Sequence, residues 1–141
     1  MQSAGDICMI RLTPHTDLKK AIMEYAEKHN MKAGIVLTCV GSLEQYHLRF
    51  AHQEKGSKST GHFEIVSLAG TFSDSACHLH LSVSDSLGLT IGGHMLEGNL
   101  IYTTAEIALA ELTDIEFARV TDPTYGFKEL VVNPRHKNPH S

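Results

Sequence analysis

The segment 76–84 has the clearest alternation of apolar and polar side chains in the sequence. Its apolar positions are Cys77, Leu79, Leu81 and Val83, and the positions between them hold His78, His80, Ser82 and Ser84. Successive side chains of a β-strand point to opposite faces, so this period of two predicts a strand with one buried face. The other face of that strand carries the two histidines.

Several other segments are predicted to be strands, because they alternate in the same way or are rich in β-branched and aromatic residues. They are residues 6–12, 33–40, 46–50, 63–72, 89–91, 99–110 and 115–120. The run 33–40 is almost continuously apolar, which predicts a strand covered on both faces. The segment 104–112 is rich in alanine, so propensity alone would also allow a helix there.

One helix is predicted after the first strand. Its apolar stripe consists of Leu18, Ala21, Ile22, Tyr25 and Ala26, which recur at helical spacing. Thr16 is the expected N-cap, and Asp17 is favourable in the first turn. The stripe ends near His29 and Asn30, where asparagine can close a helix in the left-handed conformation.

Many short strands joined by hairpin-length turns, together with one helix, predict an α+β fold. We expect a single compact domain with a mainly antiparallel sheet and one long N-terminal helix packed on it. The length of 141 residues suits one such domain. We expect the domain to span residues 1–132. The tail 133–141, which includes His136 and His140, is polar and contains prolines, and we expect it to be disordered.

The composition excludes several classes of protein. Apolar residues make up 42% and charged residues 20% of the chain, a balance typical of a globular protein rather than a disordered one. The net charge of −4 and the lack of a long basic run do not favour nucleic-acid binding. No apolar stretch approaches the ~20 residues of a membrane helix, and no leader is evident. We therefore expect an intracellular, soluble protein, cytoplasmic rather than nuclear, with no membrane partner.

The three cysteines, Cys8, Cys39 and Cys77, have no Cys-x-x-Cys spacing, and each lies in an apolar stretch. This pattern argues against a disulfide scaffold or a thiolate zinc site. We expect buried, reduced thiols.

The ten histidines are unusually many for a chain of this length. A His-x-His pair on a strand points both imidazoles to one face, about 6 to 7 Å apart at the backbone. His94 is the natural third ligand if the strand before it pairs with the histidine strand across the turn at 85–88. The preceding Gly92 and Gly93 would allow the close backbone approach that this requires.

Three histidines suit zinc, whose bonds to imidazole are ~2.0 to 2.1 Å, and leave an open position for water or a small ligand. Other divalent metals that prefer imidazole would also fit. Spacing alone equally allows His78, His80 and His94 to form no more than a polar sheet face.

Two nearby residues are candidates for a supporting role. Ser82 lies on the histidine face and could hydrogen-bond a bound ligand, although a cross-strand polar pair would be ordinary there. Glu97 is three residues after His94, the wrong parity for the same face, so contact with a metal would need a bulge. No phosphate loop or nucleophile triad is recognisable, and catalytic activity is left open.

The sequence also resembles a known family. The matching motifs are GHFEIVSLAGT at 61–71, HLH at 78–80, GGHMLEG at 92–98 and TTAE at 103–106, with RLTP at 11–14, DL at 17–18, KAGI at 32–35 and GSL at 41–43. As a set they resemble the PPC domain, the plants and prokaryotes conserved domain, also called the PCC domain. The resemblance covers residues 6–121 and is to the stand-alone branch, which has no AT-hook.

The resemblance implies a mostly antiparallel sheet packed with helices, a homotrimer, and a zinc site that maps onto His78, His80 and His94. Plant members carry DNA-binding AT-hooks, and microbial members are often labelled DNA-binding by analogy. This sequence has no Arg-Gly-Arg-Pro core, so the label transfers only weakly. The main hypothesis is a metal-binding protein of unassigned activity with a small-molecule ligand. The alternatives are a DNA-associated regulatory module and a purely oligomerising interaction domain.

Overall fold

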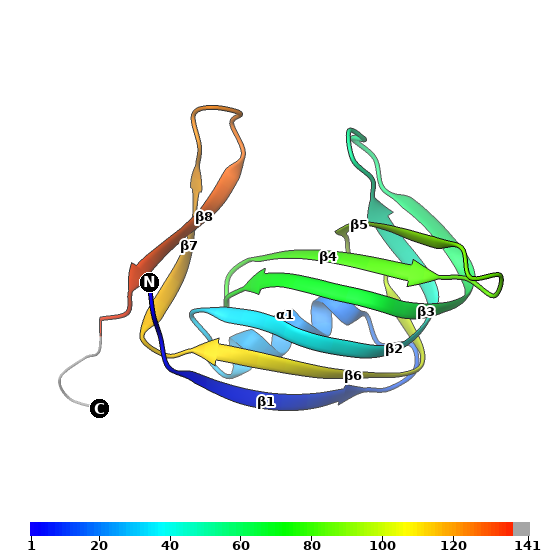
Figure 1. Ribbon diagram of the computed structural model, residues 1–141, viewed down its shortest axis with the longest axis horizontal. Helices are drawn as coiled ribbons and strands as arrows, with labels where there is room; N and C mark the ends of the chain where they lie inside the picture. The colour runs from blue at the N-terminus through cyan, green and yellow to red at the C-terminus, as the bar shows by residue number, and fades with distance from the viewer. Residues whose placement is uncertain (137–141) are drawn as a thin grey trace.

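The computed structural model describes residues 1–136, which form a six-stranded sheet, one helix and a two-stranded hairpin (Figure 1). In chain order the elements are β1 Gly5–Leu12, α1 Leu18–Lys28, β2 Gly34–Arg49, β3 Ser57–Phe72, β4 Cys77–Ser84, β5 Thr90–Met95, β6 Leu100–Leu112, β7 Ile115–Thr121 and β8 Lys128–Pro134. The sheet order is β1-β6-β2-β3-β4-β5, and β5 also pairs with β2. All pairings are antiparallel, which confirms the predicted α+β class.

The alanine-rich segment 104–112 is a strand, as the primary prediction had it. It belongs to β6, which pairs with β1 on one side and β2 on the other. Ladder hydrogen bonds on both sides and the burial of Ile107 and Leu109 outweigh the helical propensity of alanine. The helical alternative for this segment is therefore wrong.

The helix α1 is shorter than the long helix expected, with 11 residues, and it begins one residue later. Asp17, and not Thr16, is the N-cap: its Oδ1 accepts hydrogen bonds from the backbone N of Lys19 at 3.0 Å and of Lys20 at 3.2 Å. The reason is that the Thr16 carbonyl is still bonded to β6, where it accepts from the Ile101 N at 2.9 Å. Asn30 follows the helix with φ 53°, the left-handed conformation expected near its end.

The two faces of the sheet differ. One face packs against α1, whose buried stripe is Leu18, Ile22 and Ala26, and forms the core of the domain. The opposite face is open in this chain: Leu37 and Val40 of β2 are 47% and 58% exposed. The expectation that 33–40 is covered on both faces is therefore wrong for the single chain, because its one helix covers only one face.

The hairpin β7–β8 projects from the end of the sheet, beside the N-terminus (Figure 1). Asn133 and Pro134, expected to begin a disordered tail, instead pair with Glu116 and Ile115 in β7. This pairing corrects the tail boundary expected at 133. A short polar segment does not show by itself that it is a strand, because the partner strand that it pairs with is not visible in the local sequence. Residues 137–141 of the expected tail, with His140, lie outside the described residues.

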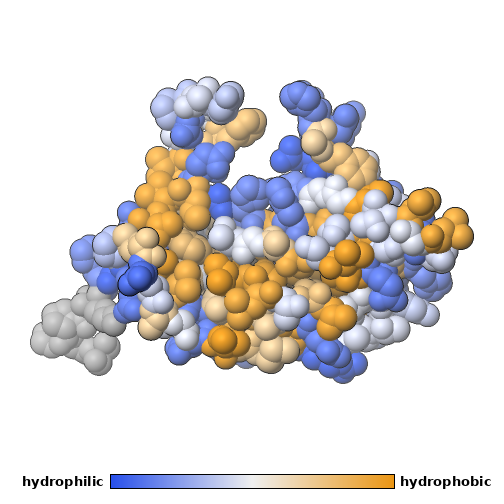
Figure 2. All heavy atoms as spheres, viewed as in Figure 1, coloured by the Kyte–Doolittle hydropathy of each residue, from blue (hydrophilic) through white to orange (hydrophobic). Residues whose placement is uncertain are grey.

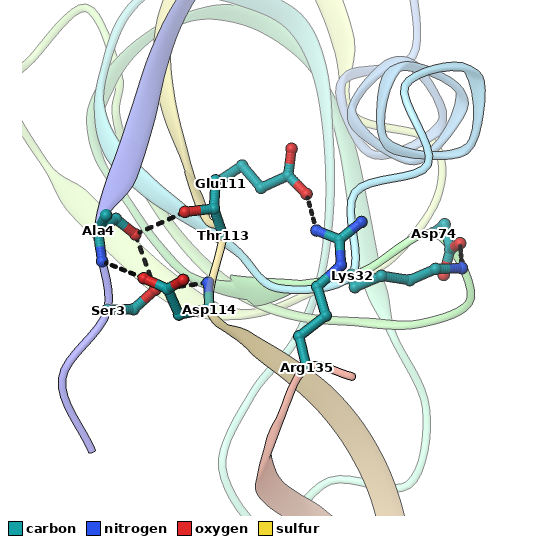
Figure 3. A network of polar contacts seen from close by, with 8 residues as sticks. All are labelled: Ser3, Ala4, Lys32, Asp74, Glu111, Thr113, Asp114 and Arg135. Carbon is teal, nitrogen blue, oxygen red and sulfur yellow. Dashed lines mark hydrogen bonds and ion pairs between the residues drawn. The ribbon is translucent and has the colours of Figure 1, made fainter. Parts of the chain in front are cut away.

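Hydrogen bonds fasten the base of this hairpin to the rest of the chain (Figure 3). The Asp114 Oδ2 accepts from the Ala4 N at 2.9 Å, and the Asp114 N donates to Ser3 Oγ at 2.9 Å. Arg135 follows β8, and its Nη1 lies 2.8 Å from Glu111 Oε1 of β6. One end of the hairpin is thus tied to the segment before β1 and the other end to β6.

The thiols of Cys8, Cys39 and Cys77 are free, as expected. Cys39 is buried, and burial raises the pKa of its thiol to about 12, so it stays protonated at neutral pH. Cys8 and Cys77 are only partly buried. In the described part of the chain, no helix has the length and apolarity needed to cross a membrane.

Candidate metal centre

His78, His80 and His94 come together on the open face of the sheet. His78 and His80 are alternate residues of β4, and His80 pairs directly with His94 of β5. One nitrogen of each ring lies within 4.8 Å of a nitrogen of the other two. The Nε2 atoms of His78 and His80 are 3.2 Å apart. The structure therefore gathers the three side chains that the spacing nominated.

The turn between β4 and β5 sets the register that brings His94 beside His80. The Asp85 Oδ1 accepts hydrogen bonds from the backbone N of Leu87 at 2.9 Å and of Leu89 at 3.0 Å. A carboxylate that binds backbone amides in this way fixes a tight turn. A shift of one residue would turn His94 to the opposite face of the sheet.

The two glycines before His94 lie where β5 passes close to its neighbours, and neither has a left-handed backbone. A Cβ on Gly93 would lie 2.6 Å from the Arg49 carbonyl oxygen of β2. A Cβ on Gly92 would lie 3.0 Å from the Ser82 Cβ of β4. Close approach, and not positive φ, is thus the reason for glycine at 93.

The spacing of the nitrogens fits a tetrahedral metal. Two imidazole ligands of zinc, with bonds of ~2.0 to 2.1 Å, have nitrogens about 3.3 Å apart. The 3.2 Å between His78 and His80 is close to that value, and a nitrogen of His94 lies within 4.8 Å of both. His78 and His80 are exposed and His94 is partly buried, so the group is accessible from the open face.

Burial and nearby positive charges favour the neutral form of His78 and His94. Burial, with a contribution from Arg49 and the neighbouring histidines, lowers the pKa of His94 to about 4. Burial also lowers the pKa of His78, with His80 and Arg119 acting in the same direction. A neutral imidazole presents a free lone pair, the form that binds a metal.

The two predicted supporting residues lie differently. Ser82 is on the histidine face, between Ser67 of β3 and Gly92 of β5, so it has the cross-strand polar neighbour that was expected. Glu97 lies beyond the end of β5, and its carboxylate is 3.5 Å from Lys20 Nζ. Its backbone oxygen is 2.6 Å from His47 Nδ1. The group of three nitrogens includes neither residue, and a supporting role for either stays a prediction.

Comparison with known proteins identifies the family. The model of the Plants and Prokaryotes Conserved (PCC) domain matches residues 1–113. The chain belongs to this PCC family. Its fold is similar to that of a hypothetical protein from Salmonella cholerae-suis, which is 34% identical with a TM-score of 0.95, over 96% of this chain and 99% of that one.

Two more distant structures share the PCC fold. A metal-containing protein from Archaeoglobus fulgidus is 22% identical, with a TM-score of 0.76, over 92% of this chain and 95% of that one. A proposed DNA-binding protein from Bacteroides thetaiotaomicron is 21% identical, with a TM-score of 0.77, over 92% and 94%. At these identities the likeness extends to the fold alone.

The PCC chain also matches part of a longer curated protein. It is 44% identical over 121 residues to the bifunctional protein GlmU of Synechococcus sp. strain JA-3-3Ab, covering 86% of this chain. The chain spans about a fifth, 20%, of the length of that relative.

Four charged residues beside the histidines were not nominated from the sequence. Arg49, Arg119, Lys128 and Glu129 line a cavity of about 540 Å³ together with His78, His94, Ala76, Cys77 and Phe127. Three of the four come from the hairpin β7–β8, beyond the residues that the PCC model matches. The alternation of its strand predicts that the Arg49 side chain points outward. Its position near His94, however, depends on the pairing of β2 with β5, which the local sequence does not show.

Proposed function

We propose that this PCC protein binds one divalent metal ion, preferentially zinc, through His78, His80 and His94, and presents it to a small-molecule ligand. The observation that carries the proposal is the convergence of three ring nitrogens, each within 4.8 Å of the others, on an accessible face. An imidazole-only donor set suits zinc and other late divalent metals. The lowered pKa values of His78 and His94 support the proposal, because neutral rings need lose no proton to bind.

The Archaeoglobus fulgidus relative, described as metal-containing, supports the same function. With three protein ligands a zinc ion has an open coordination position, and when bound it would supply Lewis acidity toward a ligand oxygen. The chain's own contribution is to hold the three imidazoles on rigid strands and to shape the cavity that a ligand enters. If the ligand is a substrate, the chemical nature of that ligand determines which reaction the metal would assist.

Elemental analysis of the untagged protein tests this function. We expect one equivalent of metal per chain in the wild type, and loss of that metal in His78→Ala/His80→Ala. His136→Ala is the matched control, because His136 is an exposed histidine outside the sheet. A wild-type protein that carries no metal, and whose folded apo form takes up neither Zn²⁺ nor Co²⁺, would overturn the proposal.

Self-association is the second part of the proposal, and the resemblance to the PPC family implies a homotrimer. The open face of the sheet supports it, because Ile7 and Met9 of β1 are 70% and 66% exposed and lie on the same face as Val40. Exposed apolar clusters of this kind usually mark interfaces. Light scattering coupled to size exclusion should give a trimer mass for the wild type and a smaller mass for Val40→Lys. A monomeric wild type would contradict this part.

A DNA-associated role is the alternative, favoured by the description of the Bacteroides relative. The net charge of −4 argues against direct contact with phosphates. We therefore expect no shift of duplex DNA at low salt, where electrostatic binding is strongest. A shift that weakens steeply with added salt would favour the alternative.

A further inference from the structure

We propose that the cavity beside the histidines binds a small anion, a ligand with a carboxylate or phosphate group, whose charge is held by Arg49 and Arg119. This inference rests on the proposed metal function, since the anion would lie against the same histidine group. The hollow is visible between the hairpin β7–β8 and the projecting end of the β2–β3 pair, where hydrophilic side chains gather (Figure 1 and Figure 2). Its volume of about 540 Å³ is that of a small-molecule site.

Arg49 is placed on the His94 side of this cavity. It is the last residue of β2 and pairs directly with His94, so the two side chains leave the sheet on the same face. Within residues 1–136 its side chain makes one hydrogen bond, which is long, 3.5 Å from Nη1 to the Gln53 carbonyl oxygen. Most of the guanidinium donors therefore have no partner in the described part of the chain and are available to a ligand.

Arg119 is placed on the His78 side. Its Nη2 donates a hydrogen bond to Thr71 Oγ1 at 3.0 Å, and Thr71 pairs with His78 across β3 and β4. The hairpin β7–β8 therefore carries a second guanidinium to the histidine group from a separate part of the chain. The same hairpin adds Lys128 and Phe127 to the wall.

Neither arginine has a carboxylate partner: no ion pair within residues 1–136 involves Arg49 or Arg119. Among the described residues that line the cavity, Glu129 is the one carboxylate, against three cationic side chains. Arginines usually find partners when they line a partly enclosed site, because a guanidinium forms paired hydrogen bonds with carboxylates and phosphates. An anionic ligand would fill that role.

The position of the arginines beside a metal site leads to the same ligand class. Arg49 pairs directly with His94, and Arg119 is hydrogen-bonded to Thr71, which pairs with His78, so two positive charges lie beside the histidine group and make the local potential positive. This potential also opposes the arrival of a divalent cation. A bound anion would offset the repulsion, so metal and anion should each strengthen the binding of the other.

Titration of inorganic phosphate tests the inference, with the protein loaded with Co²⁺ so that the visible spectrum reports metal binding separately. Wild type should bind phosphate and change its cobalt spectrum. Arg49→Gln and Arg119→Gln should each weaken phosphate binding at least about tenfold, because each removes a charge-assisted donor pair. Both should still bind Co²⁺ as tightly as wild type or more tightly. Lys28→Gln is the matched control: it removes one positive charge from α1, on the opposite face of the sheet.

Each outcome has a distinct meaning. Suppose that Co²⁺ binds, but phosphate binds equally to wild type and both arginine variants or does not bind at all. Either result overturns the anion site and leaves the proposed metal site unaffected. If Co²⁺ does not bind, the proposed metal function fails, and phosphate is titrated into the apo protein by calorimetry. Arginine-dependent heat there supports an anion site without metal, and its absence overturns both. Circular dichroism of each variant verifies folding.

Discussion

Arg49 and His94 lie directly opposite each other where the end of β2 pairs with β5. Since His94 is also paired with His80 of β4, β5 is held between two strands at the residue that completes the histidine group. The backbone next to His94 passes so close to Arg49 that a Cβ on Gly93 would lie 2.6 Å from its carbonyl oxygen. The positions of the third imidazole and of a cavity arginine thus depend on one glycine.

Gly93→Ala should lower the free energy of unfolding by about 1–3 kcal/mol, because backbone must move to accommodate the methyl group. Denaturant unfolding of the apo protein measures it. Gly92→Ala is the matched control and should cost less, since its Cβ would meet the Ser82 Cβ at 3.0 Å. We also expect weaker metal binding in Gly93→Ala. Equal costs for the two variants would show that β5 is free to shift away from Arg49.

The apo protein should lose stability as the pH falls from about 6.5, the ordinary histidine pKa, toward 4. The pKa of folded His94 is about 4 and that of folded His78 is lowered. Above pH 6.5 both states are neutral at these rings, so they contribute no pH dependence. Below pH 6.5 the two histidines bind protons in the unfolded chain but stay neutral in the folded protein, so unfolding becomes more favourable.

Urea unfolding in a chelator at pH 7 and pH 5 measures this loss. His94→Gln should reduce the difference between the two pH values, because it removes a ring whose pKa is lowered to about 4. His136→Gln, a change at an exposed histidine outside the sheet, should leave the difference unchanged. A His94→Gln protein that loses as much stability as wild type would contradict the assignment of the pH dependence to His94.

Local patterns predicted much of this fold, and long-range pairings account for what they missed. The alternation in 76–84 located β4 and turned His78 and His80 to one face, because side-chain direction depends only on position in the strand. The N-cap was displaced to Asp17 by a bond from β6 to Thr16, which no local signal contains. Arg49 and Arg119 reach the cavity through the pairing of β2 with β5 and the folding of the hairpin. The residues next to Arg49 and Arg119 in the sequence indicate neither the pairing of β2 with β5 nor the position of the hairpin.

Asp17→Ala should lower the free energy of unfolding by about 1–2 kcal/mol, at or above the usual cost of losing an N-cap. The cost should be high for an N-cap because Asp17 has a second role. Its Oδ2 accepts a hydrogen bond from the Gly98 N at 2.6 Å and so ties α1 to the loop after β5. Thr16→Ala is the control and should cost less. Thermal unfolding of the three proteins measures the order. A larger loss in Thr16→Ala would contradict the N-cap seen in the structure.

The last prediction concerns the attachment of the hairpin that carries Arg119. The ion pair of Arg135 with Glu111 fixes the end of β8 to β6, with side chains 28% and 20% exposed (Figure 3). Glu111→Gln should loosen that end, because it removes the charge at a half-buried contact. Phosphate binding to the Co²⁺ protein should then weaken several-fold, while Co²⁺ binding stays as in wild type.

The control is the other ion pair in the same view, between Lys32 and Asp74, which joins the segment after α1 to the turn between β3 and β4. Asp74→Asn breaks that pair and leaves the ion pair of Arg135 with Glu111 in place, so phosphate should bind as it does to wild type. If Glu111→Gln and Asp74→Asn had the same effect on phosphate, the loss would be a general one of stability. Only a loss specific to Glu111→Gln places the hairpin, and with it Arg119, in the binding of the anion.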